Sequence, residues 1–156
     1  METKTNAMRI LDKEKIKYDV FCFDPTITNG EQVAKILNEN PQRVFKTLVL
    51  VAKSKKNYVF MLPVCKELDL KKCAKIANEK SVEMLPQKEL FALTGYVHGG
   101  CSPIGQKKKF KTFVDDSAKK FEKIFFSAGK VGMQLEVDVD DLCRATDATL
   151  ANLTQD

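Results

Sequence analysis

Apolar and polar positions along the chain repeat with two different periods, and each period predicts one kind of element. Apolar residues spaced three and four apart, as at Ala7, Ile10 and Leu11, are typical of a helix with one buried face. Thr28 and Glu31 have the spacing of a capping box, which predicts that a helix begins there. Together these signals predict helices over residues 5–15, 28–37, 70–77, 86–94 and 140–145.

Other stretches have the composition or the alternation of strands. Residues 44–53 are almost continuously apolar and rich in β-branched side chains, as in a strand buried on both faces. A polar turn follows before the next apolar stretch, so these two segments are expected to form a hairpin. The complete set of predicted strands is 18–22, 44–53, 58–64, 96–98, 111–115, 123–127 and 133–137. Helices and strands are mixed without a regular βαβ rhythm, which predicts a mixed α/β fold with one strongly curved sheet and helices around it.

The composition is that of an ordinary globular protein. The chain has 156 residues, of which 44% are hydrophobic and 30% are charged, so we expect a single domain over residues 1–156. The net charge of +5 permits a polyanionic partner without requiring one. Met1 to Lys4 is polar, and the longest apolar run, Leu48 to Ala52, is too short to cross a bilayer. We therefore expect a cytoplasmic protein with no membrane contact.

Cysteine and histidine counts argue against a metal site. The five cysteines cannot all pair within one chain, no CxxC occurs, and there is a single histidine. Free thiols in a reducing compartment fit this pattern best. The acidic residues Asp138, Asp140 and Asp141 are interpreted as the cap of the last helix in preference to a metal cluster. No metal or other cofactor is expected.

Lys46 is the first candidate for chemistry because it interrupts an apolar strand. A buried cation needs a partner or a cavity, and it could bind a phosphate or a polarised carbonyl oxygen. Alternation would place Lys46 on the same face as Leu48 and Leu50. The other interpretation is a lysine at the exposed start of the strand, with its stem over the core and its ammonium in water.

A glycine-rich stretch is the second candidate. Four of the seven glycines lie between Gly95 and Gly105. Adjacent glycines such as Gly99 and Gly100 can direct successive N–H groups at one oxygen, although a plain turn would also use glycine and proline. The basic run of Lys107, Lys108 and Lys109 follows, either as a phosphate contact or as a solvated turn.

A cysteine–histidine nucleophile is the weaker alternative in the same stretch. His98 and Cys101 are three residues apart, but no third group that would orient them is evident.

Several motifs together resemble the YbaK/EbsC family, which is related to the editing domain of bacterial prolyl-tRNA synthetases. The resemblance spans nearly the whole chain and is most specific in two segments, Phe45-Lys46-Thr47-Leu48 and Gly99-Gly100-Cys101-Ser102-Pro103-Ile104-Gly105-Gln106-Lys107-Lys108. It implies a barrel-like sheet surrounded by helices. It also implies removal of cysteine from cysteinyl-tRNA, including cysteine wrongly attached to proline tRNA.

The resemblance also implies roles for individual residues. Lys46, Gly99 and Gly100 are expected at the reacting ester. The expected substrate-binding residues are Phe23, Asn29, Thr47, Ser102, Ser127 and Gln134, and Lys107, Lys108 and Lys109 are expected to contact tRNA. Aminoacylated tRNA is the implied partner, with prolyl-tRNA synthetase as a second one.

Two positions depart from the best-known members of the family. The best-known members carry an aromatic residue where this chain has Asn29, and an aspartate where this chain has Gln134. One histidine supplies no Ser-His-Asp triad. The family resemblance implies that the substrate thiol attacks its own carbonyl. A deacylase for alanine or serine, and a non-catalytic module that binds tRNA or a nucleotide, remain as alternatives.

Overall fold

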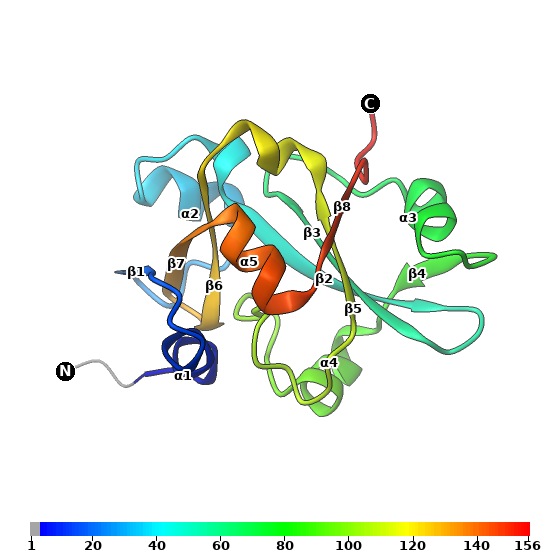
Figure 1. Cartoon of the computed structure of the whole chain (residues 1–156), viewed down its shortest axis with the longest axis horizontal. Helices are drawn as coiled ribbons and strands as arrows, with labels where there is room; N and C mark the ends of the chain where they lie inside the picture. Colours follow the sequence, from blue (N-terminus) through cyan, green and yellow to red (C-terminus); the bar gives the residue numbers. More distant parts are fainter. Residues whose placement is uncertain (1–3) are drawn as a thin grey trace.

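Five α-helices and eight β-strands make up the part of the chain described by the computed structural model, residues 4–156 (Figure 1). The helices are α1 (Asn6–Lys13), α2 (Gly30–Ile36), α3 (Leu70–Ile76), α4 (Gln87–Thr94) and α5 (Val139–Thr146). The strands are β1 (Asp19–Cys22), β2 (Phe45–Ala52), β3 (Asn57–Pro63), β4 (Val82–Met84), β5 (Lys111–Asp115), β6 (Lys123–Lys130), β7 (Met133–Asp138) and β8 (Thr149–Ala151). Met1, Glu2 and Thr3, which begin the polar N-terminal stretch, lie outside the described residues.

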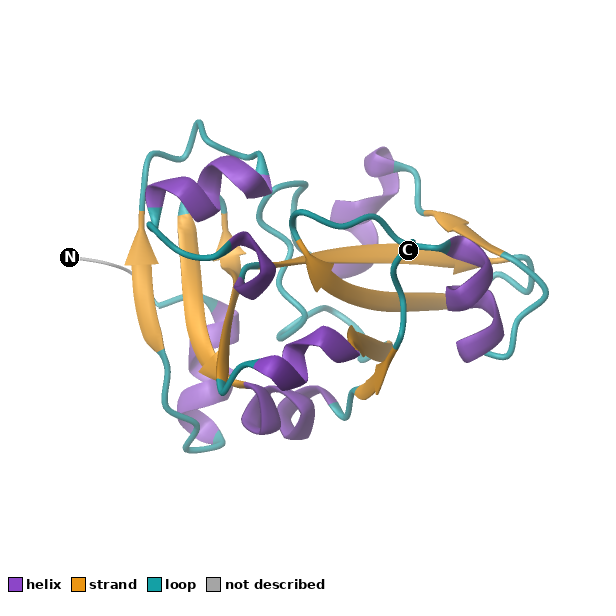
Figure 2. Cartoon of the chain, turned by 90° about the horizontal axis from the view of Figure 1, so that it is seen from above, coloured by secondary structure: helices purple, strands orange, loops and turns teal. Residues whose placement is uncertain are grey.

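The strands divide into two sheets with helices around them (Figure 2). One has the order β1-β7-β6 and is antiparallel, and the other has the order β4-β2-β3-β5-β8 and contains the parallel pairs β3–β5 and β5–β8. The mixed α/β class is therefore confirmed. The single barrel-like sheet is corrected, because the described strands close no barrel. Only an isolated bridge between Val44 and Phe125 joins the two ladders, so hydrogen bonding does not continue from one sheet into the other.

The predicted helices are confirmed, with small changes at their ends. Helix α2 begins one residue later than the capping-box pattern predicts. Its N-cap is Asn29, whose Oδ1 accepts hydrogen bonds from the N–H groups of Glu31 at 3.0 Å and Gln32 at 3.2 Å. An amide side chain at the N-cap serves the same purpose as a threonine hydroxyl, since either satisfies N–H groups of the first turn. Asp138 caps α5 in the same way, as expected.

The strand prediction is wrong at residues 96–98. This segment is a loop because the N–H of Tyr96 donates to Thr94 Oγ1 at 3.0 Å and the N–H of Gly100 donates to Val97 O at 3.0 Å. Its backbone groups are thus used in local turns and pair with no neighbouring strand. The hairpin of β2 and β3 is confirmed by seven antiparallel residue pairs, from Phe45 with Pro63 to Val51 with Asn57.

The two largest of the four apolar clusters formed by the described residues hold the sheets in place. The larger core packs α1 and α5 against the three-stranded sheet, around fully buried side chains such as Leu11, Phe126 and Leu142. The second packs α3 against the five-stranded sheet around Phe60 and Phe113, whose ring centroids lie 5.2 Å apart. A smaller cluster around Val44 and Phe125 lies where the two sheets approach each other, beside the residues of the candidate site.

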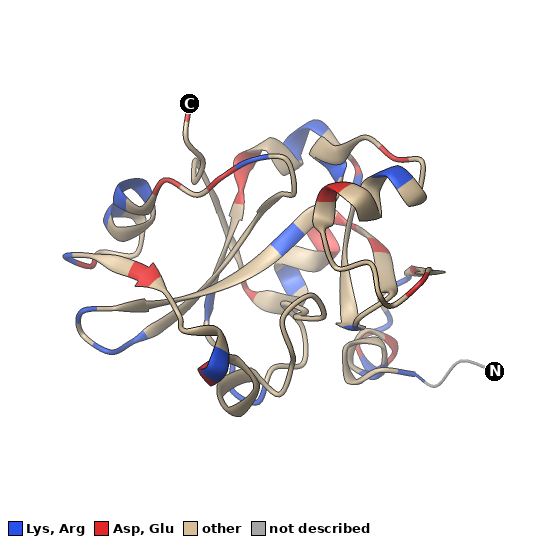
Figure 3. Cartoon of the chain, turned by 180° about the vertical axis from the view of Figure 1, so that it is seen from behind, with Lys and Arg blue, Asp and Glu red and all other residues tan. Residues whose placement is uncertain are grey.

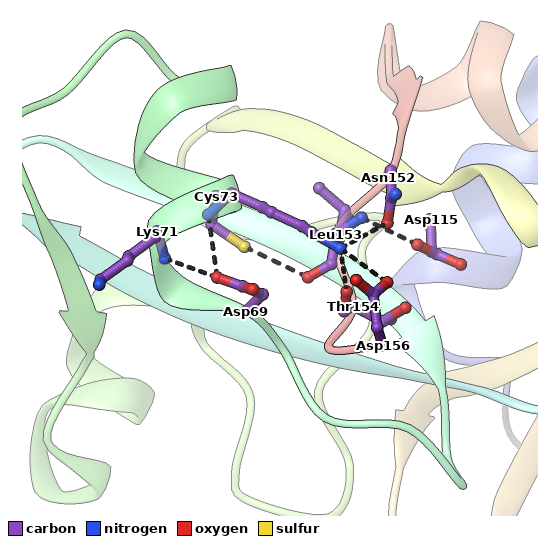
Figure 4. Close-up of polar contacts among 9 residues, drawn as sticks. Asp69, Lys71, Cys73, Asp115, Asn152, Leu153, Thr154 and Asp156 are labelled. Carbon is purple, nitrogen blue, oxygen red and sulfur yellow. Dashed lines mark hydrogen bonds and ion pairs between the residues drawn. The ribbon is translucent and has the colours of Figure 1, made fainter.

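Hydrogen bonds connect the C-terminal segment to the five-stranded sheet and to the segment before α3 (Figure 4). The buried carboxylate of Asp115 accepts a hydrogen bond from the N–H of Leu153 at 3.0 Å, and the N–H of Asp69 donates to Leu153 O at 2.8 Å. Thr154 forms an antiparallel bridge with Leu68. The last residues therefore stabilise the start of α3, on the side of the sheet away from α1.

Candidate active site

A cavity of about 560 Å³ lies where the two sheets approach each other. Strand β2 contributes Lys46 and Thr47 to its wall, and the three-stranded sheet contributes Ser127 and Gln134, which face each other in the β6–β7 register. Phe23, Asn29 and Gly99 complete the set of sequence-predicted residues at this cavity. Residues from five separate parts of the chain thus meet at one site.

Lys46, the second residue of β2, reaches the cavity from the start of the strand. Its side chain is 28% exposed, and its Nζ lies 3.8 Å from Oε1 of Glu67, whose side chain is 78% exposed. The face expected from alternation is confirmed for Leu48 and Leu50, which both pack against the core beneath α3. At this distance and exposure the ion pair is weak, so the ammonium remains available to a negatively charged or polarised ligand.

Two buried oxygen atoms in the cavity wall have no hydrogen-bond partner. They are Oε1 of Gln134, a residue that is only 9% exposed, and Oγ1 of Thr47. Ser127 lies beside them, and its Oγ accepts a hydrogen bond from the N–H of Gly129 at 3.1 Å. Leaving a buried acceptor unpaired costs about 1–3 kcal/mol.

The two adjacent glycines occupy different positions. Gly99 lines the cavity with φ of +85°, a conformation that favours glycine. Gly100 lies behind it, where an added Cβ would be 2.9 Å from the backbone nitrogen of Val131. Its N–H donates to Val97 O at 3.0 Å, so the structure uses this N–H in a local turn, whereas it was expected to face the substrate. Gly100 instead allows the loop to pack against the β6–β7 turn.

Hydrogen bonds hold the glycine loop in a fixed shape. Tyr96 is buried, and its hydroxyl donates to Ile104 O at 2.6 Å. The side chain of Asn6 donates to Gly105 O at 3.0 Å, and that of Gln106 donates to Ser102 O at 2.9 Å. A loop fixed at several points can present the Gly99 backbone to a ligand without reorganisation.

Cys101 lines the cavity but has no nucleophilic character. It is 7% exposed, and burial raises the pKa of its thiol to about 12. His98 is exposed at the cavity rim. Cys101 is therefore protonated at neutral pH, which argues against the cysteine–histidine pair.

Ser102 and the lysine run lie outside this cavity. Ser102 is completely buried, and its Oγ accepts a hydrogen bond from the N–H of Ile104 at 3.3 Å, so it shapes the loop and does not line the cavity as expected. Lys107 extends towards α4, where its Nζ lies 5.5 Å from the ring centroid of Phe91. Lys108 and Lys109 line a second cavity of about 500 Å³, bounded by α1 and the end of α5. The run therefore does not form one continuous surface.

Part of the cavity wall gave no signal in the sequence. Glu67 comes from the loop after β3, and four further residues come from β4, α4 and the segment between them: Met84, Leu85, Gln87 and Leu90. Glu67 is one of many surface carboxylates, and the three-residue strand β4 is too short to show a period. Only the fold brings these residues to the site.

Charge and metal-binding features of the described residues are unremarkable. Basic and acidic segments are interspersed along the ribbon on the side of the molecule seen in Figure 3. Residues 4–156 contain no cluster of three or more histidine, cysteine or acidic side chains that could hold a metal ion. No helix in this range is long and apolar enough to span a membrane.

Comparison with known proteins identifies the family. The aminoacyl-tRNA editing domain family matches residues 24–145. The chain belongs to this family. It is 42% identical over 155 residues to a candidate Cys-tRNA(Pro)/Cys-tRNA(Cys) deacylase, EbsC, of Enterococcus faecalis, covering 98% of this chain and 94% of that protein.

Solved structures share the fold of this editing domain. A hypothetical protein superposes with a TM-score of 0.90 at 20% identity, covering 97% of this chain and all of that one. A candidate trans-editing enzyme for prolyl-tRNA synthetase superposes with a TM-score of 0.86 at 19% identity, covering 99% of this chain and all of that one. These two likenesses establish the fold alone, and the expected membership of the editing family is confirmed by the family match.

Proposed function

We propose that this chain is a trans-editing aminoacyl-tRNA deacylase that removes cysteine from Cys-tRNA(Pro), Cys-tRNA(Cys) or both. The observation that carries the proposal is the position of Lys46 beside a cavity of about 560 Å³ whose wall also holds Gly99 and two unpaired buried oxygens. The 42% identity to a protein named for this activity supports the same substrate.

The amino-acid end of the substrate binds beside Gln134. Once the Gln134 and Thr47 side chains rotate towards the cavity, their Oε1 and Oγ1, which have no partner in the structure, accept hydrogen bonds from the α-ammonium group of the aminoacyl ester. Phe23, Asn29 and Ser127 enclose the small side chain from the three-stranded sheet and the start of α2. A neutral amide in place of a carboxylate makes this end of the cavity recognise the ammonium by hydrogen bonds without a full opposite charge.

Lys46 and Gly99 act on the ester. The Lys46 ammonium binds the ester oxygen or the nearest phosphate and fixes the carbonyl group, releasing its weak contact with Glu67. The N–H of Gly99 stabilises the negative charge that develops on the carbonyl oxygen, which is typically one of the larger contributions to acyl transfer. Gly100 contributes by holding this backbone in place.

The substrate supplies the nucleophile. The sulfur of the cysteinyl group attacks its own carbonyl carbon, forming a C–S bond as the C–O bond to the ribose breaks. The thiol proton goes to the departing ribose oxygen, and water later opens the resulting thiolactone to free cysteine. The only histidine, His98, is exposed, so no buried imidazole is available as a general base.

The remaining parts of the proposal concern the partner and its setting. Lys107, Lys108 and Lys109 contact the phosphates of the acceptor end on two sides of the glycine loop. The chain acts as one editing domain in the cytoplasm without a cofactor, and it receives tRNA released by prolyl-tRNA synthetase.

A panel of aminoacylated tRNAs tests the proposal. The chain should release cysteine from at least one of the two cysteinyl-tRNAs faster than it releases alanine, serine or proline from theirs. Faster release of alanine or serine would mean that the chain is a deacylase for that amino acid and not for cysteine. Binding of tRNA with no amino acid released from any member of the panel would contradict the proposal and favour a non-catalytic module.

A further inference from the structure

Helix α4 carries an exposed aromatic ring that the fold does not use. Leu90 and Leu93 pack against the core beneath β2 and β3, and they account for the apolar side of the helix. Phe91 points away from that core and is 59% exposed, the largest exposure of any large hydrophobic residue described. Burial therefore gives no reason for an aromatic side chain at this position.

A lysine lies beside this ring. The Nζ of Lys107 is 5.5 Å from the centroid of Phe91 and donates to Ala92 O at 3.4 Å. Its stem packs against Gly95, where an added Cβ would be 3.4 Å from Lys107 Cγ. The ammonium is thus held near one face of the ring, and the exposure of Phe91 leaves ring surface open to solvent.

The ring lies one helical turn from the cavity. Gln87, which lines the cavity, is four residues before Phe91 in α4 and so lies on the same side of the helix, about 5–6 Å away along its axis. Met84, also at the cavity wall, is 47% exposed. An extended ligand that leaves the cavity past Gln87 meets Phe91 and Lys107 within one or two nucleotide steps.

We propose that Phe91 and Lys107 form a binding site for the single-stranded 3′ end of tRNA, with a base stacked on the ring and its phosphate bound by the ammonium. An aromatic face beside a lysine is the combination by which proteins bind single strands, because every base can stack and every nucleotide carries a phosphate. The proposal rests on the proposed function, since it assumes that the terminal aminoacyl-adenosine occupies the cavity. It assigns to α4 the nucleotides that precede that adenosine.

The absence of tryptophan from the chain gives a direct test. Phe91→Trp introduces a single fluorophore at the ring position, and uncharged tRNA should quench its emission. tRNA that lacks its three 3′ nucleotides should not. Leu70→Trp is the matched control, because Leu70 is 40% exposed at the start of α3 beside Lys71 and Lys72, and its emission should not change.

Affinity measurements on the unlabelled chain complete the test. Phe91→Ala should weaken binding of uncharged tRNA at least about fivefold, and Phe91→Leu should weaken it nearly as much because the ring is lost in both. Lys107→Ala should reduce the slope of log affinity against log salt by about 0.7. An affinity within twofold of the original for Phe91→Ala, or equal quenching by truncated tRNA, would overturn the proposal. Neither readout requires turnover, so failure of this site and failure of the deacylase activity are distinguishable.

Discussion

The Nζ of Lys46 lies 3.8 Å from Oε1 of Glu67 at the open end of the β2–β3 hairpin, where β2 begins and the loop after β3 leaves the sheet. Glu67 is 78% exposed at the cavity edge, so solvent screens this pair and it adds little to stability. A pair this weak leaves the Lys46 ammonium available to a ligand in the cavity.

Lys46→Ala should reduce single-turnover deacylation of cysteinyl-tRNA at least about a hundredfold, the effect typical of losing one preorganised charge at the reacting group. Lys46→Arg should also lose activity, because a planar guanidinium does not replace a compact ammonium in a confined site. Both variants should keep the melting temperature of the original chain.

Glu67→Gln is the matched control for Lys46. It removes the other partner of the same ion pair and should change the free energy of unfolding by less than about 1 kcal/mol. An equal loss of activity in both variants would mean that the pair itself, and not the ammonium, is needed.

Gln134→Leu should separate recognition from folding. The free energy of unfolding should stay equal or rise, because an unpaired buried acceptor is removed and an apolar side chain of similar size replaces it. Binding of cysteinyl-tRNA should weaken because the α-ammonium loses its acceptor, and single-turnover rates against substrate concentration measure this. Normal binding of cysteinyl-tRNA by Gln134→Leu would mean that the α-ammonium of the substrate binds away from residue 134.

Gly100→Ala should act mainly on stability. The new Cβ would lie 2.9 Å from the backbone nitrogen of Val131, so the loop or the β6–β7 turn must shift. Such overpacking costs about 1–3 kcal/mol, to be measured by urea unfolding. His98→Ala in the same loop is the control and should leave stability unchanged, because His98 is exposed. Full stability in Gly100→Ala would show that the contact is not rigid.

The sequence predicts the elements far better than their arrangement. Helices and long strands follow from local periodicity, and Lys46 was identifiable because a cation in an apolar strand needs an explanation. The division into two sheets was not predictable, because it depends on which distant strands pair, such as β1 with β7 and β3 with β5. Pairing of residues far apart leaves no local signal.

The same limit applies to the site. Adjacent glycines look alike in a sequence, yet Gly99 faces the cavity and Gly100 faces the backbone of Val131. Glu67 and Gln87 reach the cavity only because β3 ends and α4 begins beside it. Periodicity predicts which face of an element is buried, but not which elements enclose a cavity.

Stability should fall at alkaline pH through Cys101. Burial raises the pKa of this thiol from 9.0 to about 12, so the unfolded chain releases the proton first. The contribution of the protonated Cys101 thiol to the free energy of unfolding is fully present below pH 9 and is lost as pH rises towards 12. Urea unfolding at pH values from about 8 to about 11 should show that the free energy of unfolding declines less in Cys101→Ala than in the original chain. An unchanged decline in that variant would assign the effect to other groups such as Tyr96, whose pKa burial also raises to about 12.

The account depends most directly on the cysteine thiol of the substrate. The decisive measurement is the single-turnover rate of deacylation for cysteinyl-tRNA and seryl-tRNA, with the same tRNA body and the same enzyme. We predict rapid release of cysteine and release of serine slower by far more than tenfold, because a hydroxyl is barely ionised at neutral pH while a thiol is already about a few per cent thiolate. Methylation of the substrate sulfur should abolish the reaction while binding persists. Rates within about tenfold of each other, which is only about 1.4 kcal/mol of barrier, would contradict attack by the thiol and leave Lys46 and Gly99 to activate water.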